Sequence, residues 1–157
     1  MADKVRLIDI HNSILTQFIY KFAQGNWAVQ GLQKEDINPE LYSDDWFIDE
    51  TEGQYGYIYR YPDPVNYPNI KSVLSVYDNI IINNKKFEHL CTALPSNDNF
   101  KHVKFKKYNT WYPGTYKFVT DADTFLCSIP GVEDDGMTTN VICTGLENQT
   151  WRIEPYS

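Results

Sequence analysis

Three observations predict an all-β fold, a β-trefoil of twelve short strands with pseudo-threefold symmetry. Short β-branched and aromatic segments alternate with turn-forming residues along the whole chain. Two sequence motifs recur three times in the same order, as expected for an internal repeat. Each copy carries an aromatic residue at the same relative place, so three such residues can fill one shared core.

The predicted strands are bounded by Gly, Pro, Asn and Asp, and clusters such as Pro62–Asn69 and Pro130–Gly136 predict turns or loops. Only Ser13–Phe22 has an alternative helical interpretation, and its Thr, Phe, Ile and Tyr residues are poor helix formers. We expect strands at Val5–Ile10, Gln17–Phe22, Tyr55–Tyr61, Lys71–Tyr77, Asn79–Asn83, Tyr116–Thr120 and Asn140–Thr144.

The first repeated motif is a small or apolar residue, a polar residue, Gly or Ala, and then Leu. It occurs at Val29–Leu32, Cys91–Leu94 and Cys143–Leu146. The second motif follows each copy and contains an aromatic residue, at Trp46, Phe100 and Trp151. The repeats divide a single domain into units of about 1–52, 53–108 and 109–157.

One unit cannot bury its apolar face alone, whereas three four-stranded units closing around a common axis can. Trp46, Phe100 and Trp151 are therefore predicted to form a core layer. The middle copy fits least well, because strand alternation from an inward Phe100 would also turn His102 inward. The interpretation we prefer is a bulge that buries Val103 and Phe105 instead.

The composition is that of an acidic globular protein. The net charge is −7, which argues against nucleic acid as a partner. The basic run Lys101–Lys107 is interpreted as a solvated sheet edge. Aromatic residues make up 15% of the chain and include 12 Tyr, a residue that suits both strands and binding surfaces.

Nothing in the sequence predicts catalysis, a metal or a cofactor. The nucleophile, zinc-binding and nucleotide-binding motifs that mark common enzyme classes are absent, and the three histidines lack ligand spacing. The cysteines are odd in number, without CxxC spacing, so buried thiols are expected. We predict a protein that is not an enzyme.

The N-terminus has no apolar segment typical of a signal peptide, and no apolar run approaches membrane-spanning length. The expected location is therefore the cytoplasm, or the outside after export without a classical signal. No membrane partner is predicted.

The last unit ends in Asn148-Gln-Thr-Trp-Arg-Ile153, which resembles the NQxWxI ending of ricin-B-type β-trefoil proteins. In length and acidity the chain resembles small fungal β-trefoil proteins. That group includes mushroom lectins and the mycocypin-like protease inhibitors, so the resemblance implies a loop-mediated binding function.

The inhibitor alternative is favoured, with cysteine proteases as the preferred target class and other classes possible. Such proteins block protease clefts with long loops, here Gln33–Tyr42, Pro62–Ile70 and Pro130–Thr139. Three prolines make the second loop stiff, so that little entropy is lost on binding. Position in the fold implies contacts by Asn12 and Ser13 and by Pro62, Asp63, Pro64, Asn66, Tyr67 and Asn69, with Asn66 or Asn69 as the specificity residue.

The lectin alternative retains at most one sugar site, in the third unit. The resemblance implies an Asp after the first strand, an aromatic residue that stacks on the sugar, and an Asn before the Trp. The matching residues are Asp121 or Asp123, Trp111 (with Tyr112 as its alternative) and Asn148.

Overall fold

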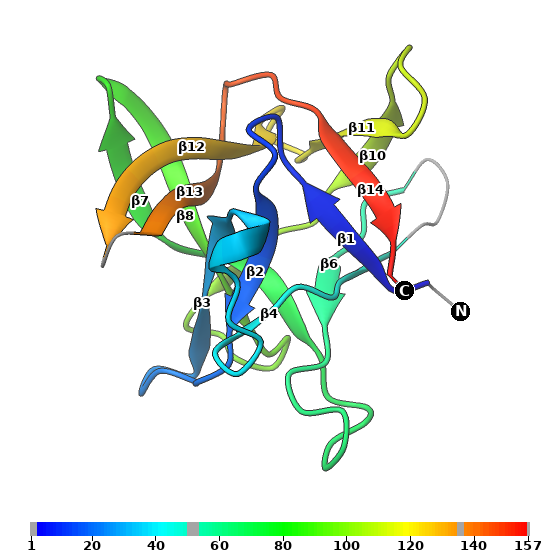
Figure 1. Cartoon of the computed structure of the whole chain (residues 1–157), viewed down its shortest axis with the longest axis vertical. Helices are drawn as coiled ribbons and strands as arrows, with labels where there is room; N and C mark the ends of the chain where they lie inside the picture. The colour runs from blue at the N-terminus through cyan, green and yellow to red at the C-terminus, as the bar shows by residue number, and fades with distance from the viewer. Residues whose placement is uncertain (1–2, 50–53, 135–136, 157) are drawn as a thin grey trace.

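The chain folds as an all-β structure (Figure 1). The computed structural model describes residues 3–49, 54–134 and 137–156; these form fourteen strands and one 3₁₀ turn, without an α-helix among them. All fourteen strands belong to one antiparallel sheet that curls around the core. None of the described helical segments is long and apolar enough to cross a membrane.

The first unit contains β1 (Val5–Ile8), β2 (Ile14–Phe18), β3 (Asn26–Leu32), the 3₁₀ turn η1 (Lys34–Asp36), β4 (Tyr42–Ser43) and β5 (Phe47–Ile48). The second contains β6 (Ile58–Arg60), β7 (Ser72–Ile82), β8 (Lys85–Ala93), β9 (Lys101–His102) and β10 (Lys106–Asn109). The third contains β11 (Thr115–Val119), β12 (Phe125–Asp134), β13 (Met137–Gly145) and β14 (Trp151–Pro155).

The all-β prediction is confirmed, while some strand bounds were wrong. Ser13–Phe22 is not helical, and its strand is Ile14–Phe18, earlier than expected. The two predicted strands at 71–83 are one long strand, β7, with a register shift between Val76 and Asp78. Pro130 lies within β12 rather than in a turn, beside a register shift that accommodates its missing N–H.

Six segments close a ring around the core. β1 pairs with β14, β14 with β11, and β11 with β10. The ring then passes through a bridge between Phe105 and Gly56, the β6–β5 pair, and a bridge between Trp46 and Val5. A closed ring has no free edge at these strands.

The remaining long strands form three hairpins, β2–β3, β7–β8 and β12–β13. Their second strands pair with one another: β3 with β8, β8 with β13, and β13 with β3. The β7–β8 turn is the pair Asn83-Asn84, both at positive φ, as a two-residue hairpin turn requires. Each hairpin thus contacts both others.

The main core contains four sets of three residues, one residue of each set from each unit. First strands supply Leu7, Ile58 and Phe118; second strands supply Leu15, Leu74 and Leu126; third strands supply Val29, Leu90 and Ile142. Trp46, Phe105 and Trp151 supply the fourth set, and Ile48 and Val103 complete the cluster. All are buried.

The predicted place of Phe100 in this layer was wrong. Phe100 is buried in a separate small cluster with Cys91 and Ala93. Phe105 bridges Gly56 as Trp46 bridges Val5, and it lies in the main core together with Val103. The predicted burial of Val103 and Phe105 is therefore confirmed.

Candidate functional site

The loop between β6 and β7 differs from its equivalents in the other units. The β1–β2 and β11–β12 connections are tight turns, closed by hydrogen bonds from Asp9 N to Ser13 O and from Thr120 N to Thr124 O, each 2.9 Å. Three residues lie inside each turn. Eleven residues, 61–71, lie between Arg60 and Ser72, so the second unit carries an eight-residue insertion.

The inserted loop protrudes at the lower end of the molecule (Figure 1). The Asp63 carboxylate accepts hydrogen bonds from the Asn66 backbone N–H (3.2 Å) and side-chain amide (3.1 Å), and Tyr67 N donates to the Asp63 carbonyl (2.9 Å). Val65 is 89% exposed and Tyr67 57% exposed. The loop therefore displays apolar side chains on a turn that is held by its own hydrogen bonds.

The predicted contact residues of this loop have different surroundings. Pro64 and Asn69 are exposed, whereas Pro62 and Asp63 are half-buried at its base. The Asn66 amide is engaged by Asp63, so Asn69 is the asparagine better placed to meet a partner.

Asn12 and Ser13 belong to the tight β1–β2 turn. Asn12 adopts a positive φ of 64°, as Asp123 does (60°) at the equivalent place in the third unit; Asn and Asp tolerate this conformation. Ser13, also predicted to lie in a protease-binding loop, is buried, and its hydroxyl accepts a hydrogen bond from Gln33 Nε2 (2.9 Å). The presence of Asn12 and Ser13 at these positions is therefore explained by the structure of the turn.

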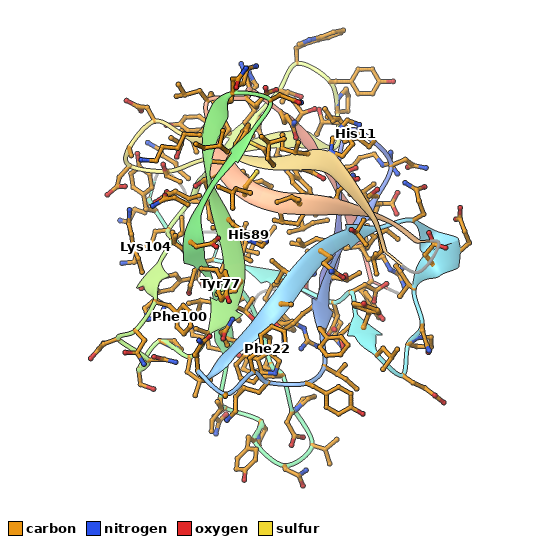
Figure 2. The ribbon with its side chains drawn as sticks, turned by 90° about the vertical axis from the view of Figure 1, so that its left-hand side faces the viewer. His11, Phe22, Tyr77, His89, Phe100 and Lys104 are labelled. Carbon is orange, nitrogen blue, oxygen red and sulfur yellow. The ribbon has the colours of Figure 1, made fainter. Side chains whose placement is uncertain are left out.

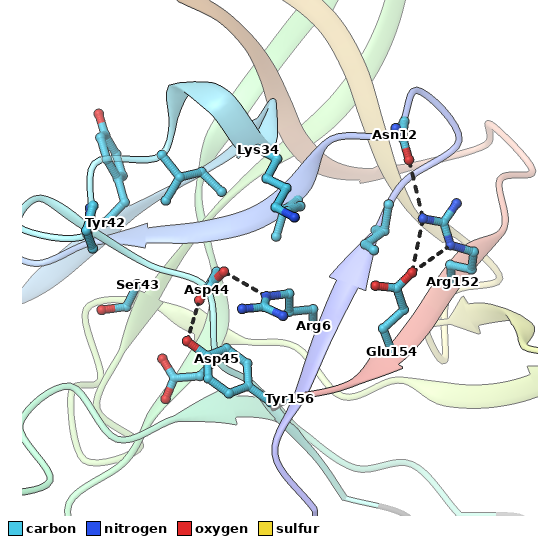
Figure 3. A pocket seen from close by; sticks show the side chains of 14 residues that line it. Arg6, Asn12, Lys34, Tyr42, Ser43, Asp44, Asp45, Arg152, Glu154 and Tyr156 are labelled. Atoms are coloured by element: carbon cyan, nitrogen blue, oxygen red, sulfur yellow. Dashed lines mark hydrogen bonds and ion pairs between the residues drawn. The ribbon is translucent and has the colours of Figure 1, made fainter.

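The segment Gln33–Tyr42 forms one wall of a polar cleft of about 600 Å³, whose floor is β1 and β14 (Figure 3). Arg6 Nε donates to Asp44 Oδ2 (2.9 Å), the Tyr156 hydroxyl donates to Asp44 Oδ1 (3.0 Å), and the guanidinium lies 4.3 Å from the Tyr156 ring centre. The hydrogen bond to Asp44 raises the pKa of Arg6. The pKa of Tyr156 is raised first by burial and then by its hydrogen bond to Asp44.

The opposite rim of this cleft is also paired. Arg152 donates to Glu154 (3.2 Å) and to Asn12 (3.3 Å). The charges of Arg6, Asp44, Arg152 and Glu154 are thus paired within the chain, and the hydrogen bonds of Asp44 tie its segment to β1 and to Tyr156. Sequence reasoning missed the cleft because its residues come from three distant segments.

A second hollow, of about 750 Å³, lies where β10 meets β11. It is lined by the rings of Tyr108, Trp111 and Tyr112 together with Lys117 and Asn148. Trp111 is 92% exposed and meets Tyr112 edge to face, with ring centres 5.8 Å apart. We call this hollow, lined by Tyr108, Trp111, Tyr112, Lys117 and Asn148, the aromatic hollow.

The predicted sugar-site residues come together only in part. Trp111 and Asn148 share the aromatic hollow, but Asp121 lines a different hollow with Tyr55, Tyr57 and His102. Asp123 is a turn residue and lines neither. Gln149 of the repeated motif is buried and bonds the backbone N–H (2.8 Å) and carbonyl (3.2 Å) of Ser128.

The described residues bring no reactive group to the surface beside a base. Ser75 Oγ lies 2.8 Å from His102 Nδ1, but Ser75 is fully buried. Cys91, Cys127 and Cys143 are buried free thiols, and burial raises the pKa of Cys91 to about 12. No group of three or more His, Cys, Asp or Glu suited to a metal ion occurs in the described part of the chain.

Comparison with known proteins identifies neighbours in fold. No protein-family model matches the sequence, and no curated protein matches it. The structure of Cry35Ab1 aligns with a TM-score of 0.61 and 13% identity over 99% of this chain, but over only 36% of Cry35Ab1 itself. This chain thus spans about a third of that protein.

A salivary protein from Culex quiquefasciatus, of the Cysteine and Tryptophan-Rich family, aligns equally well. Its TM-score is 0.61 at 13% identity, covering 99% of this chain and 95% of the salivary protein. At 13% identity the likeness shows a shared β-rich fold, and no function is inferred from it.

Proposed function

We propose that this protein is a β-trefoil protease inhibitor of the mycocypin-like kind, whose Pro62–Asn69 loop enters the active-site cleft of a cysteine protease. It would act as a binding protein and not as an enzyme, in the cytoplasm or after non-classical export. The observation that carries the proposal is the eight-residue insertion at a place where the other two units have tight turns.

The trefoil assignment is supported by the pairing pattern. Six segments close a ring, and three hairpins pair mutually through β3, β8 and β13. Four core positions are each filled once from each unit. These are the relations expected of three units around a common axis.

The inhibitory role is supported by the form of the loop. An inhibitor loop must fit a narrow cleft and lose little conformational freedom on binding. Here the prolines restrict the backbone, the Asp63 contacts close its turn, and Val65 and Tyr67 offer apolar area. Asn69 is exposed beside them and is our choice of specificity residue for an asparagine-directed protease.

Inhibition assays test this directly. The wild-type protein is titrated against asparagine-directed, papain-like, serine and aspartic proteases, and we expect tight inhibition of a cysteine protease. Asn69→Ala should weaken inhibition of the asparagine-directed enzyme by at least about tenfold, because it removes the side chain that is read.

Asn79→Ala is the matched control, since Asn79 is an exposed asparagine on β7 away from the loop. Weak or no inhibition of all four classes by the wild type would contradict the proposal. Equal effects of the two alanine variants would contradict the role of Asn69.

A second candidate function, carbohydrate binding, is favoured by the aromatic hollow. An almost fully exposed Trp is unusual on a soluble protein, and aromatic faces beside amide and hydroxyl groups suit a sugar ring. A glycan array with wild type and Trp111→Ala tests it. The lectin proposal fails if no glycan binds, or if binding survives the substitution.

A further inference from the structure

The surface beside the aromatic hollow carries a concentration of positive charge that neither proposed function uses. Five lysines lie between residues 101 and 117 of a chain whose net charge is −7. We call this set the lysine strip: Lys101, Lys104, Lys106, Lys107 and Lys117. It follows β9, β10 and β11, and Figure 2 labels Lys104 at the edge of the molecule.

Tyrosine rings lie close to the ammonium groups of two lysines of the strip, Lys104 and Lys106. Lys104 Nζ lies 5.3 Å from the ring centre of Tyr57, and Lys106 Nζ lies between Tyr55 (5.9 Å) and Tyr108 (5.4 Å). These are cation–π distances, at which the ring attracts the ammonium without neutralising it. Through the part of the chain described, neither lysine forms an ion pair with a carboxylate.

The strip is continuous with the aromatic hollow. Tyr108 supports Lys106 and also lines the hollow. Lys117 lies opposite Tyr108 in the β10–β11 pairing and lines the hollow as well. A ligand stacked on Trp111 would therefore meet a cation at one side and the lysine strip beyond it.

Carboxylates limit the charge at the far end. Lys101 lies 3.8 Å from Glu88, and Asp121 lines the adjoining hollow. The strip thus offers a few spaced cations, not an unbroken basic surface. A nucleic acid carries one phosphate per nucleotide and is repelled by the acidic remainder of the protein.

We infer that the lysine strip and the aromatic hollow together bind an acidic saccharide, one that carries sulfate or carboxylate groups. Its sugar ring stacks on Trp111 beside Tyr112, Asn148 hydrogen-bonds its hydroxyls, and Lys106 and Lys117 pair with its anionic groups. This inference rests on the carbohydrate-binding candidate and is independent of the protease loop.

The test uses isothermal titration of the whole protein with four probes. They are a sulfated oligosaccharide, a uronate-containing one, a neutral one of the same length, and a single-stranded oligonucleotide. We expect the sulfated or the uronate probe to bind at least about tenfold tighter than the neutral one, with affinity falling as salt is raised.

Variants locate the site. Lys106→Gln combined with Lys117→Gln should remove the preference for the acidic probe over the neutral one. Lys86→Gln is the matched control, because Lys86 is an exposed lysine in β8. It should change the affinity for neither the acidic nor the neutral probe. Trp111→Ala should weaken all saccharides.

The outcomes separate the two levels of the proposal. If no saccharide binds, the carbohydrate candidate itself fails. If neutral and acidic probes bind alike, or the double variant has no effect, only the lysine strip inference is overturned. Equal or tighter binding of the oligonucleotide overturns it too.

Discussion

Individual residues explain why three dissimilar units share one core. The Trp46 indole N–H donates to the Leu15 carbonyl (2.9 Å), and the Trp151 indole donates to Leu126 (2.8 Å). Leu74 occupies the equivalent place in the second unit, where Phe105 has no donor. There the backbone N–H of Val103 donates to the Leu74 carbonyl instead (2.9 Å).

A residue-scale prediction concerns Trp46. Trp46→Phe keeps an aromatic ring in the core but leaves the buried Leu15 carbonyl without its donor. We expect the free energy of unfolding to fall by about 1–3 kcal/mol, measured by urea denaturation. Trp111→Phe makes the same chemical change at an exposed site and should cost less than about 0.5 kcal/mol. Equal losses would contradict the role of the hydrogen bond.

At the scale of elements, register decides which side chains are inside. The repeated motif was aligned one residue out of register in the first unit: Val29 is equivalent to Leu90 and Ile142, not to Cys91 and Cys143. The leucine at the end of the motif is consequently buried at Leu32 but 82% exposed at Leu146. A one-residue slip exchanges the two faces of a strand, so similar letters do not ensure similar environments.

An element-scale prediction concerns the inserted loop. Replacing Pro62–Lys71 by the dipeptide His–Asn copies the β1–β2 turn and retains Tyr61, whose ring packs on Phe47 and Tyr59. The free energy of unfolding should change by no more than about 1 kcal/mol, because closing a shorter loop costs less entropy and the loop buries little. Thermal unfolding measures this.

The same variant should lose protease inhibition. A variant that fails to fold would instead mean that the loop is needed for the architecture. In that case the exposed-residue variant Tyr67→Ser, which leaves the Asp63 contacts in place, carries the functional test.

At the scale of the whole molecule, polar contacts join the first and third units. Asp9 is buried in the β1–β2 turn, yet its carboxylate accepts hydrogen bonds from Asn140 Nδ2 (3.1 Å) on β13 and from the Ser128 hydroxyl on β12. Asp9 Oδ1 is satisfied within the turn by the N–H groups of His11 and Ser13, whereas Oδ2 finds its partners only when both units are in place. The β1–β2 turn of the first unit therefore obtains part of its hydrogen bonding from β12 and β13 of the third unit.

A whole-molecule prediction concerns alkaline pH. Burial raises the pKa of Cys91 from 9.0 to about 12, and the neighbouring Cys127 and burial also raise that of Cys143. The folded state thus holds these protons more tightly than the unfolded state. The stability is fully present below about pH 9 and declines as the pH rises towards 12, by up to about 1.4 kcal/mol per pH unit for each thiol.

Urea denaturation at a series of pH values from about 8 to about 11 measures this decline in the free energy of unfolding. Tyr59 and Tyr156, whose pKa values are also raised, contribute in the same direction. Cys91→Ala should therefore reduce the slope against pH without abolishing it. An unchanged slope would contradict the assignment to Cys91.

The sequence by itself determined the features that depend on local chemistry. Strand propensity and turn residues indicate an all-β chain, the odd number of cysteines without CxxC spacing predicts buried thiols, and three prolines mark Pro62–Asn69 as a loop. The burial of Trp46 and Trp151 also follows from their repeated context.

Only the tertiary structure decided which residues meet. Phe105 takes the place in the main core that was predicted for Phe100, and the buried Ser13 hydroxyl accepts a hydrogen bond from Asn140, which is distant in sequence. The lysine strip and the aromatic hollow combine segments around 55, 104–117 and 148, which strand pairing brings together. Such contacts depend on register and closure, and neither is written in any local stretch of residues.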